Sequence, residues 1–222
     1  VEIDHANNPI PELAESWEPS PDAVKWTFKL RKDVEFHNGK TMDADDVVFS
    51  VMHHKRDDSK SVIKSIVKPI KEVKAEDKYT VSFTLESGNA DFPYLMNDIH
   101  LQIVPKDTTD FEKGIGTGGY ILESWEPGVR MFTRKNPNYF KENRAHFDAV
   151  EILGIADVTA RTNAVRTQQV DVINRCDKKT VHLLGRLPNV NVVSTTGTKH
   201  YTMPMRCDRP PFQNKDARLA MK

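Results

Sequence analysis

The hydrophobic period of this chain changes within residues 26–51, and that change constrains the fold more than any other feature. Trp26, Phe28 and Leu30 alternate with polar residues, a pattern typical of a strand that buries one face. The pair Asn38-Gly39 then predicts a tight turn, because asparagine and glycine readily adopt the positive φ angles that such turns need. The chain is therefore expected to leave a half-buried strand and turn before residue 43.

A helix with a strong N-terminal signal follows the turn. Asp43 is a favourable N-cap residue, and Asp45 and Asp46 place negative charge at the positive end of the helix dipole. The valines at positions 47, 48 and 51 give this helix an apolar face. The two adjacent acids are thus explained by their place in a helix, without a role in acid–base catalysis.

The composition argues against several classes of function. The chain of 222 residues contains 32 Lys plus Arg and 32 Asp plus Glu, so its formal net charge is zero. Nucleic-acid-binding domains and polybasic membrane-binding surfaces need an excess of positive charge. No apolar run approaches the roughly 20 residues that span a bilayer, and no signal peptide is visible at the start. We therefore expect no nucleic-acid partner and no membrane insertion of this segment.

Alternating or apolar runs predict further strands along the chain. The expected strands cover residues 73–79, 80–85, 120–125, 131–134, 147–155, 170–173, 190–194 and 199–205. A helix capped by Asp157 lies between the strands at 147–155 and 170–173. A strand, a helix and a strand within about 30 residues form a βαβ unit, which predicts a parallel sheet.

Gly114, Gly116 and Gly119 formally match the Gly-x-Gly-x-x-Gly pattern of dinucleotide-binding loops. Such a loop precedes a helix whose N-terminus faces the phosphate groups. The residues that follow here, 120–125, predict a strand instead. We therefore interpret the glycines as a turn. The chain also lacks a Gly-x-Ser-x-Gly nucleophile motif and any Cys/His cluster with zinc-ligand spacing.

The turn and the helix start resemble the signature of the family 5 extracellular solute-binding proteins, the peptide-, opine- and nickel-binding subunits of ABC importers. The family turn reads Lys-x-Val-x-Phe-His-x-Gly and is matched by Lys32, Val34, Phe36, His37 and Gly39. The family helix begins Thr-Ala-Glu-Asp-Val-Val-Phe-Ser and is matched by Ala44, Asp46, Val47, Val48, Phe49 and Ser50. Asp43 and Asp45 replace the family's Thr and Glu, and both replacements keep the capping chemistry.

The resemblance continues to the end of the chain. Gly116-Thr117-Gly118 and Tyr120 resemble a Gly-Thr-Gly-Pro-Tyr element, with Gly119 in place of the proline. The further matches are Pro11, Leu13, Ala14, Ser16 and Trp17; Asn136 to Phe140; Arg161, Ala164 and Asp171; Arg209 to Phe212; and Asp216, Arg218 and Ala220. Gln168 stands where the family has glycine.

This resemblance implies an α/β fold, a periplasmic-binding-protein type II-like lobe with mixed β-sheets and flanking helices. Residues 1–115 would form an insert-like subdomain of lobe one, and residues 116–222 its truncated βαβ-containing core. Family members have two lobes that close on their ligand. The chain is therefore interpreted as the amino-terminal part of a longer protein, without the second lobe.

The implied function is the non-catalytic substrate-binding component of an ABC importer. A dipeptide or oligopeptide is the expected ligand, because a cleft can hydrogen-bond an extended backbone whatever its side chains. The expected partners are this peptide or another small-molecule ligand and an ABC permease in the inner membrane, with no cofactor. The expected location is the periplasm, or the cell surface through a lipid anchor.

Other functions stay open at this point. Nickel chelates, haem, opines and oligosaccharides are alternative ligands within the family. A ligand-sensing regulatory module could use the same fold. A hydrolase is a third function class, against which the missing nucleophile and metal motifs count.

Candidate ligand-binding residues follow from two considerations. Ligands of open α/β sheets bind beyond the carboxyl ends of the strands. That rule selects residues around two predicted strands, namely Asn174, Arg175, Asp177, Met203, Met205 and Arg206. Asp98 and His100 resemble a family segment that faces the cleft. A core role for the methionines and a solvated role for the arginines are the competing interpretations. The family usually has Asn at the position of Arg206, where a cation would favour an anionic ligand group.

Cys176 and Cys207 are the only two cysteines of the chain. Each follows a predicted strand, so both could lie at the same end of one sheet. An exported protein allows disulfides, and we therefore consider a Cys176–Cys207 bond, with two free thiols as the alternative.

Overall fold

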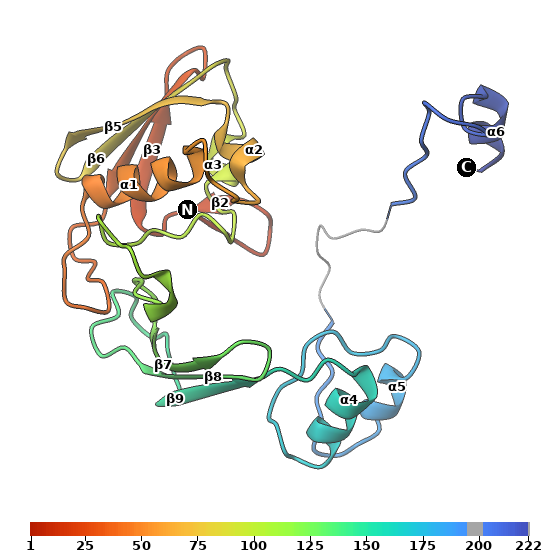
Figure 1. The fold of residues 1–222 in the computed structure, drawn as a ribbon. Helices are drawn as coiled ribbons and strands as arrows, with labels where there is room; N and C mark the ends of the chain where they lie inside the picture. The colour runs from red at the N-terminus through yellow and green to blue at the C-terminus, as the bar shows by residue number, and fades with distance from the viewer. Residues whose placement is uncertain (195–201, 222) are drawn as a thin grey trace. The chain divides into compact units, whose positions relative to one another are not determined.

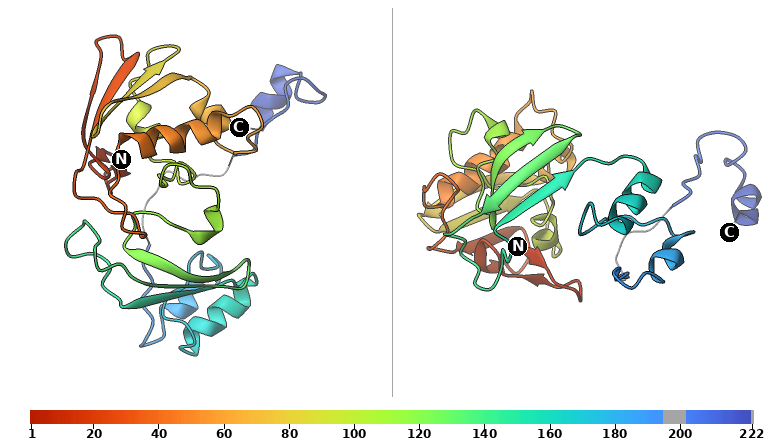
Figure 2. Two further views of the ribbon diagram at one scale, coloured as in Figure 1. Left: turned by 60° about the vertical axis from the view of Figure 1, so that its left-hand side comes forward. Right: turned by 90° about the horizontal axis from the view of Figure 1, so that it is seen from below.

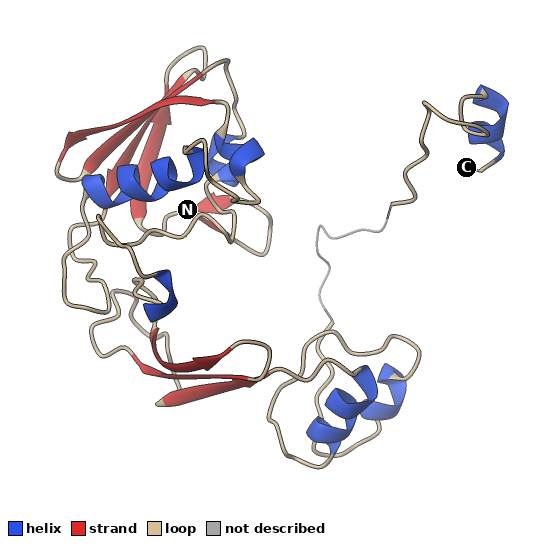
Figure 3. Cartoon of the chain, viewed as in Figure 1, coloured by secondary structure: helices blue, strands red, loops and turns tan. Residues whose placement is uncertain are grey.

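A computed structural model describes residues 1–194 and 202–221 of the chain (Figure 1). The chain folds as two compact units, Val1–Gly154 and Ile155–Lys222. Figure 2 shows the ribbon from two further directions. All strands of the described residues belong to the first unit, as the colouring by secondary structure shows (Figure 3). The division of lobe one after residue 115 stays a prediction.

A four-stranded antiparallel sheet is the centre of the first unit. Its strands, in order across the sheet, are β3 (Ala14–Pro19), β4 (Lys25–Leu30), β6 (Thr80–Leu85) and β5 (Ile70–Asp77). The predicted alternation in β4 is confirmed, because Trp26, Phe28 and Leu30 are all buried. The sequence did not predict β3, whose residues alternate only weakly; pairing with β4 makes this segment a strand.

The predicted turn and capped helix are confirmed. Gly39 has a φ of +82°, and its N–H donates to the carbonyl of Phe36. Helix α1 (Ala44–Lys55) begins at a capping box: the Asp43 carboxylate accepts from the N–H of Asp46, and the Asp46 carboxylate accepts from the N–H of Asp43. α1 then packs against β5 and β6.

The hydrophobic core of the first unit is aromatic at its centre. The ring of Phe28 lies 6.1 Å from Trp17, 5.3 Å from Phe83 and 6.1 Å from Phe92, measured between ring centroids. Phe92 opens α3 (Phe92–Leu95), so this short helix closes one side of the core. Burial of such rings is the main favourable contribution to the folding of this unit.

Smaller elements complete the first unit. They are β1 (Glu2–Ile3), β2 (Pro9–Ile10), α2 (Lys64–Val67) and the 3₁₀ helix η1 (Phe111–Lys113). Strands β1 and β2 pair with each other in a short antiparallel arrangement.

A second antiparallel sheet ends the first unit. It contains β7 (Tyr120–Glu126), β8 (Arg130–Lys135) and β9 (Ala149–Leu153), with β8 in the centre. The strands predicted at 120–125 and 131–134 are confirmed, and they pair as a hairpin with Gly128 at a φ of +75° in its turn. A strand, β7, follows the glycine loop at residues 114–119, as the sequence predicts.

The second unit contains three helices in its described residues: α4 (Val158–Arg166), α5 (Val181–Leu184) and α6 (Lys215–Ala220). The predicted cap of α4 is confirmed, because the Asp157 carboxylate accepts the N–H of Ala160 at 2.7 Å. Among the described residues of the second unit, the buried apolar side chains are those of Ala164 and Leu184.

Two predicted strands and the parallel sheet are wrong for this structure. Residues 170–173 and 190–194 form no strand, and every strand pairing of the described residues is antiparallel. A strand needs a hydrogen-bonded neighbour, and here Val172 and Val193 are exposed instead of packed. Of the strand predicted at 199–205, residues 199–201 lie outside the described residues, and residues 202–205 form no strand.

Candidate functional site

A cavity of about 820 Å³ opens in the first unit. The central sheet supplies its apolar wall through Phe28, Leu30 and Phe83, all of which belong to the hydrophobic core. Residues 96–104 and the last turn of α1 supply a polar wall. Ligand sites are commonly clefts of ~300–1,000 Å³ with apolar walls and a few polar groups, and this cavity fits that description.

Histidines from two elements line the polar wall. His100 Nδ1 lies 2.8 Å from Asp98 Oδ1, which also accepts the backbone N–H of His100 at 2.9 Å. His53 and His54 come from the end of α1; the His53 ring centroid lies 4.7 Å from that of Phe111, with the ring planes tilted by 46°. All of these residues line the cavity, so an aromatic and imidazole-rich surface faces its interior.

Burial sets the charge of this wall. It lowers the pKa of His54, and electrostatic interaction with His53 and His100 lowers that pKa further, whereas Asp98 opposes the shift. The pKa of Asp98 is also lowered, chiefly because its carboxylate accepts the backbone N–H of His100. At neutral pH the wall therefore carries a neutral His54 imidazole near the Asp98 carboxylate. These groups can exchange both kinds of hydrogen bond with a polar ligand.

The glycine loop and His37 form another part of the cavity lining. The His37 backbone N–H donates to the carbonyl of Gly116 at 2.8 Å. The ring also contacts the loop, since Nδ1 accepts the N–H of Gly116 at 3.3 Å and Nε2 lies 2.9 Å from the carbonyl oxygen of Gly118. The loop is thus fixed to the signature turn that the sequence singled out.

Comparison with known sequences decides the family. Residues 8–222 match the bacterial extracellular solute-binding proteins, family 5 Middle. The chain belongs to this family. The resemblance carried by residues 32–50 and the later motifs is therefore confirmed.

Relatives of this family 5 chain include two periplasmic proteins of Escherichia coli (strain K12). The probable D,D-dipeptide-binding periplasmic protein DdpA is 25% identical over 221 residues, which cover 95% of this chain and 42% of DdpA. The periplasmic oligopeptide-binding protein OppA is 26% identical over an alignment length of 247 residues, and the alignment covers 97% of this chain and 44% of OppA. The chain thus spans less than half the length of these relatives.

Solved structures confirm the predicted fold class, an α/β fold of the type II periplasmic binding proteins. MoaA from A. tumefaciens R10, in complex with mannopinic acid, is 30% identical, with a TM-score of 0.75 over 95% of this chain and 44% of MoaA. DppA from Helicobacter pylori, in complex with the peptide STSA, is 28% identical, with a TM-score of 0.70 over 81% of this chain and 40% of DppA.

The two units of the family 5 chain divide the predicted ligand residues between them. Asp98 and His100 lie together on the cavity wall of the first unit. The other six residues, Asn174, Arg175, Asp177, Met203, Met205 and Arg206, belong to the second unit. Their roles as ligand residues stay predictions.

Local contacts already occupy two of those six side chains. Asp177 accepts the backbone N–H of Lys179, and Arg206 forms an ion pair with Asp208 at 2.7 Å. The Met203 side chain is 81% exposed, so the competing core role does not apply to it in this structure.

The predicted bond between Cys176 and Cys207 is not formed in this structure. Both are free thiols, with Cys176 half-buried and Cys207 exposed. The prediction placed both cysteines at the end of one sheet, but residues 170–173 and 202–205 form no strands that would bring them there. Alkylation of the unreduced protein followed by mass measurement counts the free thiols directly.

His53 and His54 are among the cavity residues that the sequence analysis did not single out. They belong to the basic last turn of α1, yet both are half-buried and line the cavity. The missed signal is their place one turn after Ser50 and Val51, which are buried. On a helix, residues three and four apart share a face.

Two further properties of the described residues concern metal ions and membranes. Across residues 1–194 and 202–221, no group of three or more His, Cys, Asp or Glu side chains is arranged to hold a metal ion. Within the same residues no helix is both long and apolar enough to cross a bilayer.

Proposed function

We propose that the protein containing this chain captures a ligand for an ABC importer and does no chemistry on it. The family match over residues 8–222 carries this proposal. Relatives with this fold bind small solutes or peptides, and the first unit offers a cavity of about 820 Å³ of suitable size. The chain would supply part of lobe one, and the ligand would stabilise a closed form by binding it more tightly than the open form.

A peptide is the ligand class that we favour. DdpA and OppA are described as a D,D-dipeptide-binding protein and an oligopeptide-binding protein, and DppA from Helicobacter pylori holds the peptide STSA. The cavity wall agrees with this class, because it places the Asp98 carboxylate and the His54 and His100 imidazoles beside aromatic surface. A peptide presents amide donors and acceptors together with apolar side chains, and both kinds of group would find partners.

The partners and location follow from the same proposal. The closed, liganded form would dock on an ABC permease in the inner membrane, and the protein would act in the periplasm or from a lipid anchor on the cell surface. The periplasmic descriptions of DdpA and OppA support this location.

A thermal-shift screen of the full-length protein tests the proposal. The panel contains di- to pentapeptides, nickel chelates, haem, opines and oligosaccharides. A ligand at 100 times its dissociation constant adds about 2.7 kcal/mol of stability, which raises the melting temperature by several degrees in a protein of this kind. We expect hits among the peptides. Hits in another class would replace the peptide, and turnover of a panel member would favour a hydrolase.

A further inference from the structure

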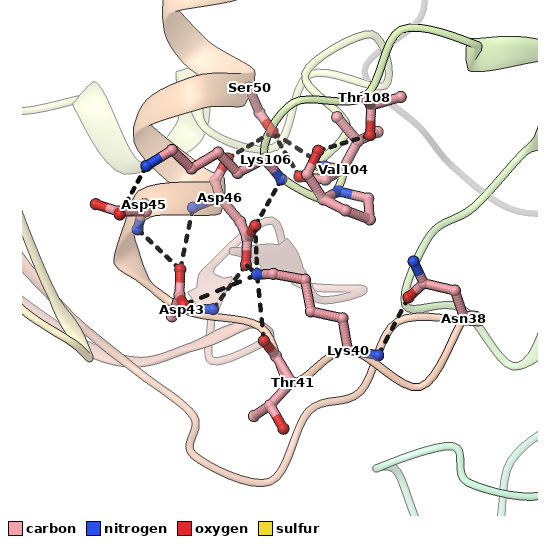
Figure 4. A network of polar contacts seen from close by, with 11 residues as sticks. Asn38, Lys40, Thr41, Asp43, Asp45, Asp46, Ser50, Val104, Lys106 and Thr108 are labelled. Carbon is pink, nitrogen blue, oxygen red and sulfur yellow. Dashed lines mark hydrogen bonds and ion pairs between the residues drawn. The ribbon is translucent and has the colours of Figure 1, made fainter.

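Buried polar contacts join the start of α1 to the segment at residues 104–106, far along the chain (Figure 4). The side chain of Asp46 is fully buried. Its oxygens accept from Lys40 Nζ at 2.7 and 2.5 Å, from the Asp43 N–H at 2.9 Å and from the Lys106 N–H at 2.7 Å. A buried carboxylate needs this complete set of donors, because an unpartnered buried charge is strongly unfavourable.

Ser50, one turn further along α1, makes the second connection. Its hydroxyl donates to the carbonyl of Asp46 at 2.7 Å and accepts the backbone N–H of Val104 at 3.0 Å. The Ser50 side chain is 1% exposed, so water does not replace these bonds. Asp46 and Ser50 therefore hold two amides of one segment, Val104 and Lys106, against the same face of α1.

The segment that these residues hold, 104–106, directly continues residues 96–104 of the cavity's polar wall. Residues 96–104 line the cavity, and they include Asp98 and His100. Residues 96–106 form no strand or helix, so no ladder of backbone hydrogen bonds fixes their position. The backbone N–H groups of residues 96–98 donate to carbonyls of the preceding helix α3, and beyond them the N–H of Leu101 donates to the carbonyl of Asp98 in a local turn.

We infer that Asp46 and Ser50 are positioning residues that lock the wall carrying Asp98 and His100 onto α1. This inference concerns the geometry of the cavity wall, and its consequence for ligand affinity rests on the proposed function. It assigns a role to two signature residues that otherwise only begin a helix. A one-atom change in a buried serine should loosen the wall without removing the helix cap.

Amide hydrogen exchange of the full-length protein tests the inference. In Ser50→Ala we expect the Leu101 amide to exchange about 3- to 10-fold faster, the factor equivalent to one lost hydrogen bond. Leu101 is informative because its own partner, the carbonyl of Asp98, is not altered by the substitution. Amides of the central sheet, such as Phe28 and Val81, should keep their wild-type rates.

Two further variants separate positioning from general destabilisation. Asp45→Asn removes the exposed ion pair between Asp45 and Lys106 Nζ, which lies at 3.1 Å, but leaves the backbone bonds of the segment. It should leave Leu101 exchange unchanged. Ser50→Thr keeps a hydroxyl and should restore slow exchange. Unchanged Leu101 exchange in Ser50→Ala, or equal acceleration throughout the central sheet, would overturn the inference.

Binding of the peptide STSA is measured on the same variants by calorimetry, well below their melting temperatures. We expect weaker binding to Ser50→Ala than to the wild type or Asp45→Asn. If STSA and the rest of the panel bind none of them while Leu101 exchange responds as expected, the proposed function fails and the positioning role stands.

Discussion

His37 and Gly116, 79 residues apart in the chain, hold each other by two hydrogen bonds. The His37 N–H donates to the Gly116 carbonyl at 2.8 Å, and the Gly116 N–H donates to His37 Nδ1 at 3.3 Å. Because Nδ1 accepts, the ring proton is assigned to Nε2, where it faces the carbonyl of Gly118 at 2.9 Å. The signature turn thus fixes the glycine loop of the cavity through one tautomer of one imidazole.

Removal of the His37 ring should destabilise the first unit. We expect His37→Ala to lower the free energy of unfolding by about 1–3 kcal/mol, because the Gly116 N–H loses its side-chain acceptor and the Gly118 carbonyl keeps only its bond from Asn136. His37→Asn is the matched variant, since its side-chain oxygen can take the place of Nδ1 and accept from Gly116. Urea unfolding of the full-length protein gives both values. An Asn variant no better than Ala would assign the effect to packing instead.

The N-cap of α1 offers a second prediction. Asp43→Ala should lower the free energy of unfolding by about 0.5–2 kcal/mol, because the N–H groups of Asp45 and Asp46 lose their acceptor. Asp43→Ser keeps a capping oxygen and should lose much less. Urea unfolding monitored by helical circular dichroism measures both, and equal losses in the two variants would contradict a capping role.

Phe28 should be among the most sensitive core positions. We expect Phe28→Ala to cost about 3–5 kcal/mol, because its ring is packed against Trp17, Phe83 and Phe92 and leaves a cavity when removed. Phe147 is the matched control: its side chain is 70% exposed, so Phe147→Ala should change stability by at most about 0.5 kcal/mol. Denaturant unfolding curves compare the two, and similar losses would place the core elsewhere.

Glu76 should make stability depend on pH in acid. The Ser82 hydroxyl at 2.8 Å, followed by Lys74 and Lys25, lowers the pKa of Glu76 from 4.5 to about 2. A lowered pKa in the folded state stabilises that state above pH 4.5, and the contribution disappears as the pH falls from 4.5 to about 2.

Unfolding midpoints between pH 6 and pH 2 test this prediction. The unfolding midpoint of the wild type should be higher than that of Glu76→Gln at pH 6. The difference between the two midpoints should shrink as the pH falls from 4.5 to about 2. Glu72→Gln, on the same strand, is the control for loss of an exposed carboxylate. A difference between wild type and Glu76→Gln that stays constant with pH would show that the interactions of Glu76 do not depend on its charge.

Local sequence determined the elements whose stabilising contacts lie within a few residues. The alternation around Phe28, the positive φ of Gly39 and the capping box at Asp43 each depend on near neighbours, and all three are present in the structure. Residues of the same turn and helix start also carried the resemblance to the family, because the family motif consists of residues that form this local structure. The pairing of β5 with β6 was equally accessible, since a two-residue turn joins them.

The tertiary structure alone decided features that need a distant partner. Residues 170–173 have the composition of a strand but no neighbour to pair with, so they are not one. Conversely, Ala14–Pro19 is a strand because β4 lies beside it. The cavity wall has the same origin: Asp46 and Ser50 gain their second role only when residues 104–106, more than 50 positions later, pack against α1. Hydrogen bonds between distant segments leave no period in the sequence, so only the folded chain shows them.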